Sequence, residues 1–306
     1  MPTERVAALA VPIVRKEPSG VSVLADYWAL TKPDVNLLIL ITTAAGFCLA
    51  RSMHGVGFQV FLLVHTLAGT LLVASGTATL NQYVEHRFDA QMRRTKRRPL
   101  AAGRIEPARA LWFGITLSVF GAIYLAAAVN FLASLLAILT LLSYLLIYTP
   151  LKRKTPLCVL VGAFPGAAPP LIGWAAVSGT LSLEAWVLYG MVFLWQFPHF
   201  MAIAWMYRED YQRAGYQVLP ESKDKTSFMT WQIILPSAGL LVLSFAPTLL
   251  AKGSLFYPAG ALFFSICFLY YGVQLATGKT NAAARRLLLA SILYLPVVFA
   301  LMMLAH

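Results

Sequence analysis

The sequence predicts an all-α integral membrane protein with nine transmembrane helices and a cytoplasmic amino terminus. Three observations predict this fold class. Hydrophobic side chains make up 59% of the 306 residues and charged side chains only 12%, whereas charged residues are about 25% of an ordinary soluble domain. Long stretches of the chain carry no charge, and the Lys and Arg residues gather in alternate connections between them. Such hydrophobicity also excludes an intrinsically disordered chain.

The predicted helices follow from eight stretches that contain no Asp, Glu, Lys or Arg. Seven of these stretches supply one spanning helix each, since a helix crosses the bilayer in about 20 residues and satisfies its own backbone hydrogen bonds there. The eighth, residues 110–151, is about twice that length and has a polar break at Asn130, which predicts a hairpin of two helices. The seven single stretches are residues 35–50, 52–84, 155–183, 185–207, 226–251, 253–278 and 287–306.

The positive residues give the orientation. Of the 24 Lys and Arg residues, 22 lie in the amino-terminal segment or in the connections that follow predicted helices two, four, six and eight, and only Arg51 and Lys252 lie on the other side. Because cytoplasmic loops retain positive residues, this asymmetry supports the count of nine and a cytoplasmic amino terminus. Orientation and anionic lipid headgroups account for the net charge of +12, so the basic run at 93–98 predicts no nucleic-acid partner.

The chain is predicted to divide at residue 26. Residues 1–26 mix acidic, basic and apolar residues, and their apolar run is short for a secretory signal, so they are expected to form a flexible cytoplasmic segment. Residues 27–306 contain all the predicted helices and form a single membrane domain. The chain has no acid-poor leader rich in Arg and Ser, which favours a bacterial plasma membrane over the mitochondrial inner membrane.

The inner end of the second predicted helix carries three oxygen-bearing side chains, Asn81, Glu85 and Asp89. A step of four residues advances a helix by about 400° and about 6 Å, so the three share one face. Amide and carboxylate oxygens suit a hard cation such as Mg²⁺, which commonly bridges protein carboxylates to substrate phosphates. The pattern therefore indicates a magnesium site, although an ordinary helix end with charge pairs four residues apart has the same spacing.

Basic residues follow this helix end directly. Arg97 and Arg98 belong to the run RRTKRR, and guanidinium groups donate hydrogen bonds to phosphate oxygens. Beside a magnesium site they would bind a diphosphate. The connection after the fourth predicted helix adds Lys152 and Arg153 on the same side, although an orientation signal alone explains any one of these residues.

A second acidic cluster, Glu209 and Asp210, follows the sixth predicted helix on the same side. If the two helix ends pack together, they clamp a polyanion between them through metal ions. No carboxylate lies in the middle of a predicted span. This disfavours the alternative of a secondary transporter, because transporter sites lie near the bilayer midplane.

Four motifs occur in order along the chain: NQYVEHRFDAQMRRTKRRPL at 81–100, YTPLKRKTP at 148–156, GAFPGAAPPLIGW at 162–174, and WQFPHF followed by REDY at 195–211. They resemble those of the intramembrane aromatic prenyltransferase superfamily, and within it most closely the family of protohaem IX farnesyltransferases, or haem O synthases. The likeness covers roughly residues 25–300. Glu85 stands where the wider superfamily has an Asp, and REDY replaces its second Asp-x-x-x-Asp motif.

The resemblance implies nine helices around a central chamber, with an active site near the cytoplasmic face. It implies Mg²⁺-dependent transfer of a farnesyl group from farnesyl diphosphate to a vinyl group of haem B, with addition of water to give haem O. A quinone precursor or a chlorophyll stays open as the acceptor. Membrane lipid, a downstream haem-modifying enzyme and a second copy of the chain are further candidate partners. The implied residues are Asn81, Glu85, Asp89, Glu209 and Asp210 for the metal, Arg97, Arg98, Lys152 and Arg153 for the diphosphate, and Asp89, Asp210, His199 and Tyr148 for catalysis.

Two features inside predicted helices keep more than one interpretation. His199 needs a partner within its span. Its roles as haem-iron axial ligand, in proton or water handling near the vinyl group, and as structural hydrogen-bond partner stay open. Pro165, Pro169 and Pro170 interrupt the fifth predicted helix. The interruption is either a packing kink or a widening for a planar tetrapyrrole, since irregular backbone is tolerated where it lines a cavity.

Overall fold

The protein is built from helices throughout the part of the chain that the computed structural model describes, residues 20–55, 57, 59–220, 225–250 and 256–305. Nine helical segments of this part are long and apolar enough to cross a membrane, which confirms the predicted number. The elements are α1 (Gly20–Leu30), α2 (Pro33–Met53), α3 (Val60–Asp89), α4 (Pro107–Ala128), α5 (Phe131–Leu142), the π-helix η1 (Ser143–Tyr148), α6 (Thr149–Leu151), α7 (Cys158–Gly166), α8 (Pro169–Ser178), α9 (Leu183–Met206), α10 (Arg208–Arg213), α11 (Lys225–Leu243), α12 (Ala246–Leu250), α13 (Phe256–Gly278) and α14 (Asn281–Ala305).

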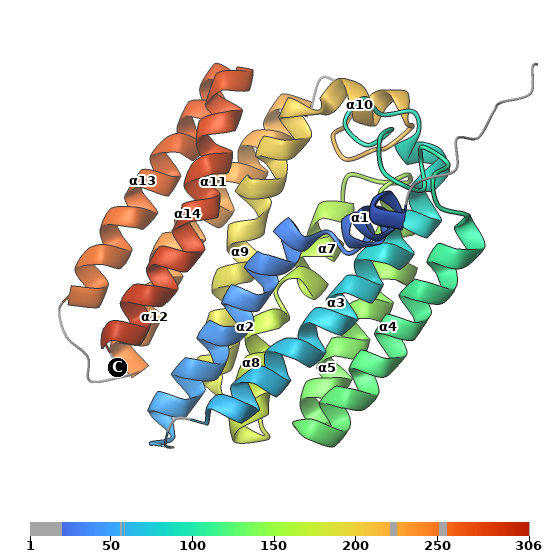
Figure 1. The fold of residues 1–306 in the computed structure, drawn as a ribbon. Coiled ribbons are helices and arrows are strands. Elements are labelled where there is room, and N and C mark those ends of the chain that lie inside the picture. Colours follow the sequence, from blue (N-terminus) through green and yellow to red (C-terminus); the bar gives the residue numbers. More distant parts are fainter. Residues whose placement is uncertain (1–19, 56, 58, 221–224, 251–255, 306) are drawn as a thin grey trace, which may run out of the picture.

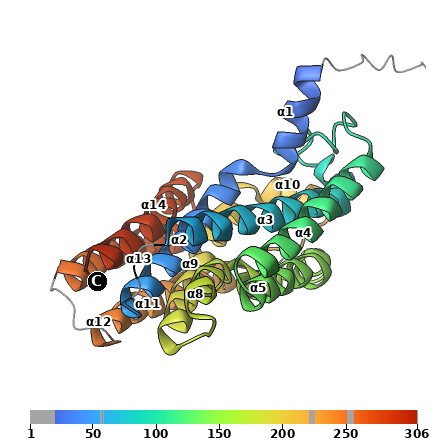
Figure 2. The ribbon, with the colours of Figure 1, turned by 60° about the horizontal axis from the view of Figure 1, so that its bottom comes forward.

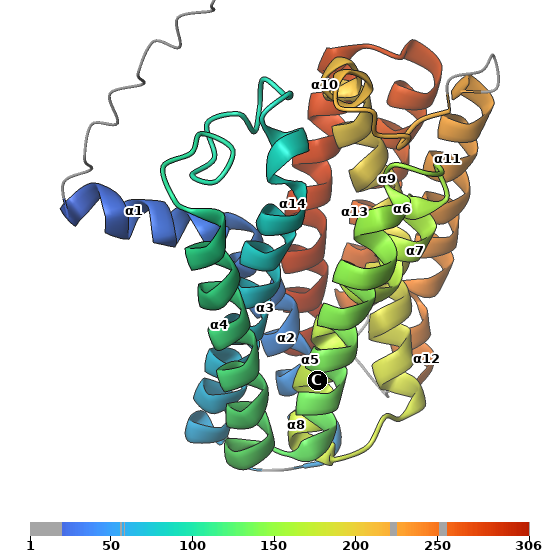
Figure 3. The same cartoon turned by 90° about the vertical axis from the view of Figure 1, so that its right-hand side faces the viewer.

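The long helices form one bundle, and the connections with predicted site residues lie at one of its ends. Helix α10 and the connection between α3 and α4 lie at the upper end in Figure 1, whereas α14 ends at the opposite end. Helix α1 lies across the bundle axis near the upper end (Figures 2 and 3). The predicted boundary at residue 26 falls inside α1. Residues 1–19 lie outside the described residues, so the flexible segment stays a prediction.

The stretch 110–151 forms the predicted hairpin. Asn130 separates α4 from α5 and caps α5, because its Oδ1 accepts a hydrogen bond from the backbone N–H of Ala133 at 2.9 Å. Its Nδ2 donates to the carbonyl oxygen of Ala175 in α8 at 2.7 Å. A polar side chain at this bend thus satisfies both a helix terminus and a neighbouring helix.

The fifth span is interrupted as its prolines predict. Helix α7 ends at Gly166 and α8 begins at Pro169. Beyond the break, α8 packs so closely on α2 that a Cβ at Gly173 would overlap the carbonyl oxygen of Thr43, and one at Gly46 that of Pro170. These two glycines allow the backbones to touch, which supports the packing interpretation of the break.

Replacing Gly173 with valine is expected to destabilise the fold, because the overlapping atoms belong to the α2 backbone and cannot rotate away. Overpacking of this kind costs about 1–3 kcal/mol, and the melting temperature in detergent should fall by several degrees. Gly278→Val is the matched control, since no atom lies within 4 Å of a Cβ built at that position. Equal melting temperatures for the two variants would contradict the close approach of α2 and α8.

Candidate active site

The carboxyl-terminal end of α3 presents Asn81, Glu85 and Asp89 on the single face that their spacing predicts. All three residues are buried, with 6% or less of their surface exposed. The Nδ2 of Asn81 donates to Glu85 Oε2 at 2.9 Å, one turn along the helix, and it lies 3.3 Å from Thr149 Oγ1. Burying two carboxylates is unfavourable unless cations or hydrogen bonds compensate, so the neighbours of this face decide what it can do.

Each of the three side chains is contacted by a cation from a different segment. One cation lies before α2, one after α6 and one in the connection after α3. The contacts are Lys32 Nζ to Asn81 Oδ1 at 3.0 Å, Lys152 Nζ to Glu85 Oε1 at 2.8 Å, and Arg98 Nη1 to Asp89 Oδ2 at 2.8 Å. Three segments far apart in the sequence therefore converge on one helix end.

Lys32 is the member of this cluster that sequence analysis did not single out. It joins α1 to α2 with a left-handed backbone (φ 51°), which costs a residue with a side chain about 1–2 kcal/mol. Burial, to which the charge of Arg98 adds, lowers the pKa of its ammonium group to about 7. The sequence signal was weak, since a Lys before a predicted span is also an ordinary orientation signal.

Lys152 lies between a carboxylate and two aromatic rings. Its Nζ is 4.6 Å from the centre of the Tyr148 ring and 5.7 Å from that of Tyr144, within the range of cation–π interactions. Burial lowers the pKa of the Lys152 ammonium group, but the Glu85 carboxylate outweighs this and leaves the pKa well above its usual value. The backbone N–H of Gln217 donates to the Lys152 carbonyl oxygen at 2.7 Å. Lys152 is therefore a fixed positive charge.

Asp210 in α10 holds the loop that follows Asp89. Its two carboxylate oxygens accept hydrogen bonds from the backbone N–H groups of Arg93 and Arg94, both at 3.1 Å, and Oδ1 also accepts one from Arg213 Nη1 at 2.9 Å. Burial raises the pKa of the Asp210 carboxyl group, but these donors together lower it below its usual value. The second acidic helix end therefore contacts the loop that begins after Asp89, and the metal clamp between the two helix ends stays a prediction.

Apolar side chains also pack where α10 meets the loop after α3. Met92, Ala214 and Tyr216 form a buried cluster against Phe88 and Tyr211. Burial raises the pKa of the Tyr216 hydroxyl, and the nearby Glu85 carboxylate raises it further. Tyr216 could not be predicted from the sequence, because nothing in its local pattern indicates a contact with a helix so far away in the chain.

Three other predicted residues are not part of this buried cluster. Glu209, Arg97 and Arg153 are exposed. The guanidinium of Arg153 lies 4.1 Å from the centre of the Phe88 ring, next to the acidic face. The predicted residues that the structure brings together are Asn81, Glu85, Asp89, Arg98, Tyr148, Lys152 and Asp210.

His199 lies farther into α9, about 10 Å along the helix from its end at Met206. Its Nδ1 is 2.7 Å from Ser291 Oγ in α14, and that hydroxyl donates to the Leu288 carbonyl oxygen at 2.6 Å. A hydroxyl has one proton, so it accepts from Nδ1–H and the lone pair of the imidazole is on Nε2. Trp195 stacks on the ring, with centroids 4.6 Å apart. His199 therefore has a structural partner at Nδ1 and an acceptor lone pair at Nε2.

The oxygen atoms of the acidic face are of the kinds that bind a hard cation. Its oxygens come from one amide and two carboxylates, the ligand types that Mg²⁺ prefers, and ammonium and guanidinium groups already contact them. In the described part of the chain, no group of three or more His, Cys, Asp or Glu side chains is placed to hold a metal ion. A bound Mg²⁺ would therefore depend on the Asn81 oxygen and on oxygens of its substrate.

An all-helical membrane bundle with these charged groups at one end is the arrangement expected of the intramembrane prenyltransferases that the sequence motifs resemble. The chain belongs to the UbiA prenyltransferase family, since residues 39–299 match the sequence model of that family. Among its relatives, the protoheme IX farnesyltransferase of Solibacter usitatus (strain Ellin6076) is 45% identical over 287 residues, which cover 92% of this chain and 98% of the relative. This protein is thus a prenyltransferase.

Solved structures share the fold. The structure of a digeranylgeranylglyceryl phosphate synthase superposes with a TM-score of 0.72 and 17% identity, covering 92% of this chain and 98% of that one. A UbiA homolog from Archaeoglobus fulgidus, solved with GPP and Mg²⁺ bound, gives a TM-score of 0.65 and 18% identity, covering 90% of this chain and 99% of that one. The predicted all-α membrane fold is confirmed by these neighbours.

Proposed function

We propose that this protein transfers the farnesyl group of farnesyl diphosphate to a vinyl group of haem B, with Mg²⁺ as cofactor and addition of water, giving haem O. The observation that carries the proposal is the convergence of cations from three segments on the buried acidic end of α3. The choice of donor and acceptor is supported by the relative at 45% identity, which is named protoheme IX farnesyltransferase.

The cations of the cluster would hold the diphosphate. Among the described residues, Lys152 and Arg98 pair with the carboxylates of Glu85 and Asp89, whereas Lys32 contacts the uncharged amide of Asn81. Excess positive charge in a buried site is unfavourable by itself, and a polyanion offsets it. As the allylic carbon–oxygen bond breaks, negative charge grows on the leaving diphosphate, and fixed donors stabilise that charge most strongly as it forms.

The acidic face would hold the metal. We assign Asn81, Glu85 and Asp89 as ligands from α3, and Asp210 with Glu209 as the ligands from the second helix end. When bound, Mg²⁺ would neutralise part of the charge of the diphosphate and so ease its departure. The hydrogen bond from Asn81 to Glu85 orients both side chains before any ligand arrives.

The prenyl acceptor must reach the farnesyl cation before water does. A membrane-embedded bundle favours this, because it excludes solvent and holds both reactants. We place Tyr148, which lies under Lys152, on the donor side, and His199 on the haem side. We propose that this end of the bundle faces the cytoplasm, which the positive residues of its connections support, and the bacterial relative favours the plasma membrane of a bacterium.

The direct test incubates purified protein with haem B, farnesyl diphosphate and Mg²⁺ and analyses the haem by mass spectrometry. The expected product is haem with a farnesyl group and one added water. A parallel reaction with a quinone precursor should give no prenylated product. Farnesylation of that precursor, with haem B left unchanged, would contradict the proposed acceptor.

His199→Ala is expected to change the absorption spectrum of bound haem, because the Nε2 lone pair is suited to ligate iron. Ser291→Ala should give a smaller change, since it removes the partner that fixes the tautomer. Ser237→Ala is the matched control, as this buried hydroxyl bonds only within α11, to the carbonyl oxygen of Ile233. An unchanged spectrum with lost activity in His199→Ala would assign the imidazole to proton transfer instead.

A further inference from the structure

Helix α1 is fixed to the active-site end of the bundle by a bidentate ion pair between Asp26 and Arg104. Arg104 Nε lies 3.0 and 2.9 Å from the two carboxylate oxygens of Asp26, and Arg104 Nη2 lies 2.8 Å from Oδ1. Asp26 is buried, with 8% of its surface exposed. Paired, charge-assisted hydrogen bonds of this kind give geometric specificity as well as energy.

The same Arg104 is part of the connection that carries the basic run. Its Nη1 donates to the carbonyl oxygen of Arg97 at 3.1 Å. Beside it, Leu30 of α1 packs against Leu100 and Ile105, and all three side chains are buried. The connection between α3 and α4 has no helix of its own. These contacts hold its second half, while Asp210 and Asp89 hold its first half.

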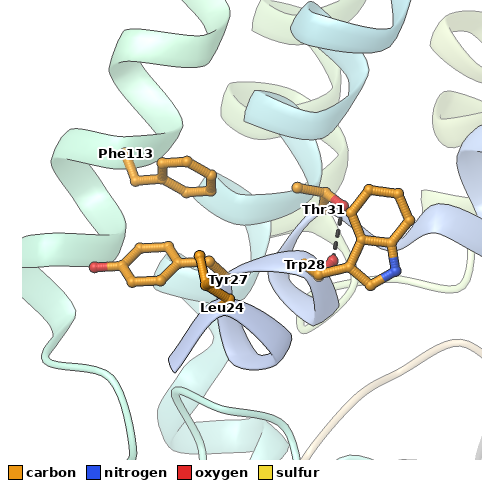
Figure 4. A pocket seen from close by; sticks show the side chains of 5 residues that line it. All are labelled: Leu24, Tyr27, Trp28, Thr31 and Phe113. Carbon is orange, nitrogen blue, oxygen red and sulfur yellow. Dashed lines mark hydrogen bonds between the residues drawn. The ribbon is translucent and has the colours of Figure 1, made fainter. Parts of the chain in front are cut away.

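The opposite face of α1 makes few contacts with the bundle. Leu24 and Trp28 are 73% and 66% exposed, and with Phe113 of α4 they line an open groove of about 520 Å³ (Figure 4). Tyr27 touches the edge of the Phe113 ring, with centroids 4.9 Å apart. Because this side is open, the position of α1 depends on the Asp26 face.

We infer that Asp26 and Arg104 are positioning residues for the diphosphate site. Their ion pair holds the backbone at Arg97, so that the next residue, Arg98, reaches Asp89. It also fixes α1, which leads within two residues to Lys32. One contact outside the cluster therefore helps to place two of its three cations, together with the hydrogen bond that Gln82 Nε2 donates to the Leu30 carbonyl oxygen at 2.8 Å. The inference rests on the proposed function in one respect, namely that these cations hold a prenyl diphosphate.

The test compares the wild-type protein with Asp26→Asn, which keeps the shape and removes the charge. Binding of farnesyl diphosphate should weaken about tenfold or more, because a charge-assisted contact is lost. The KM for farnesyl diphosphate should rise in parallel and kcat should fall, because the same cations stabilise the leaving diphosphate, whereas the KM for haem should change less than about twofold. Arg104→Lys keeps the charge but loses the bidentate geometry of the guanidinium, so its affinity for farnesyl diphosphate should lie between those of the wild type and Asp26→Asn. The double variant Asp26→Asn with Arg104→Gln should be no worse than Asp26→Asn alone.

Glu106→Gln is the matched control, because it makes the same charge change in the connection that carries Arg104. Its pair with Arg109 is longer, at 3.5 Å, and exposed, so diphosphate binding should stay within about twofold of wild type. Hydrogen–deuterium exchange provides a readout that is independent of catalysis: amides of residues 97–104 should exchange faster in Asp26→Asn and not in Glu106→Gln.

Two results would overturn the inference: unchanged exchange at 97–104 in Asp26→Asn, or faster exchange there with unchanged diphosphate binding. If Asp26→Asn does not assemble, Arg104→Lys gives the same comparison. If the wild-type protein leaves haem B unmodified while diphosphate binding still weakens in Asp26→Asn, the proposed acceptor is wrong and the positioning role stands.

Discussion

Replacing Asp89 with alanine is expected to reduce farnesyl transfer by about 100- to 1,000-fold, which is the usual effect of removing one preorganised group that stabilises charge in a transition state. Asp89 is buried at the end of α3 and pairs with Arg98 at 2.8 Å. Its loss removes a proposed Mg²⁺ ligand and also releases Arg98. Initial rates of farnesylated haem formation, measured over a range of Mg²⁺ concentrations, give the size of the effect.

Asp89→Asn separates the two contributions. It keeps an oxygen of similar position but removes the charge, so we expect partial recovery of activity at higher Mg²⁺ concentration. Glu106→Ala is the control, because this carboxylate is exposed at the same end of the molecule. Wild-type turnover in Asp89→Ala, at normal expression in the membrane, would contradict the metal assignment.

The helices could be predicted because the bilayer imposes a strict requirement. A charge-free stretch of sufficient length has no alternative to a helix in lipid, and the single polar residue Asn130 marks the hairpin because it caps the second helix. Helix α1 could not be predicted in this way. It carries the charged Asp26, lies across the bundle, and is held by Arg104, 78 residues away in the sequence.

The candidate site likewise contains residues that local sequence spacing predicts and residues that it does not predict. The shared face of Asn81, Glu85 and Asp89 follows from local helix geometry, so their spacing was sufficient. The partners of this face come from other segments, and no local pattern distinguishes Lys32 from an ordinary positive residue before a membrane span. Its contact with Asn81 depends on a left-handed turn that tertiary packing stabilises.

Asp210→Ala is expected to reduce farnesyl transfer by about 100-fold, because Asp210 anchors a loop in addition to its proposed role as a metal ligand. The carboxylate accepts hydrogen bonds from the backbone N–H groups of Arg93 and Arg94, so its loss leaves both donors unsatisfied and releases the loop that carries the basic run. We therefore expect the KM for farnesyl diphosphate to rise together with the loss of kcat. Activity assays with varied farnesyl diphosphate measure both.

Hydrogen–deuterium exchange distinguishes an anchor from a ligand. If Asp210 only bound metal, Asp210→Ala would leave the exchange of residues 93–98 unchanged in the absence of Mg²⁺. Because two of its contacts are with backbone amides of that run, we expect those amides to exchange faster without any metal present. Arg213→Gln is the matched variant: it removes a side-chain partner of Asp210 at 2.9 Å but leaves both backbone contacts, so its exchange should stay near wild type. Slow exchange in Asp210→Ala would show that the loop is held by other contacts.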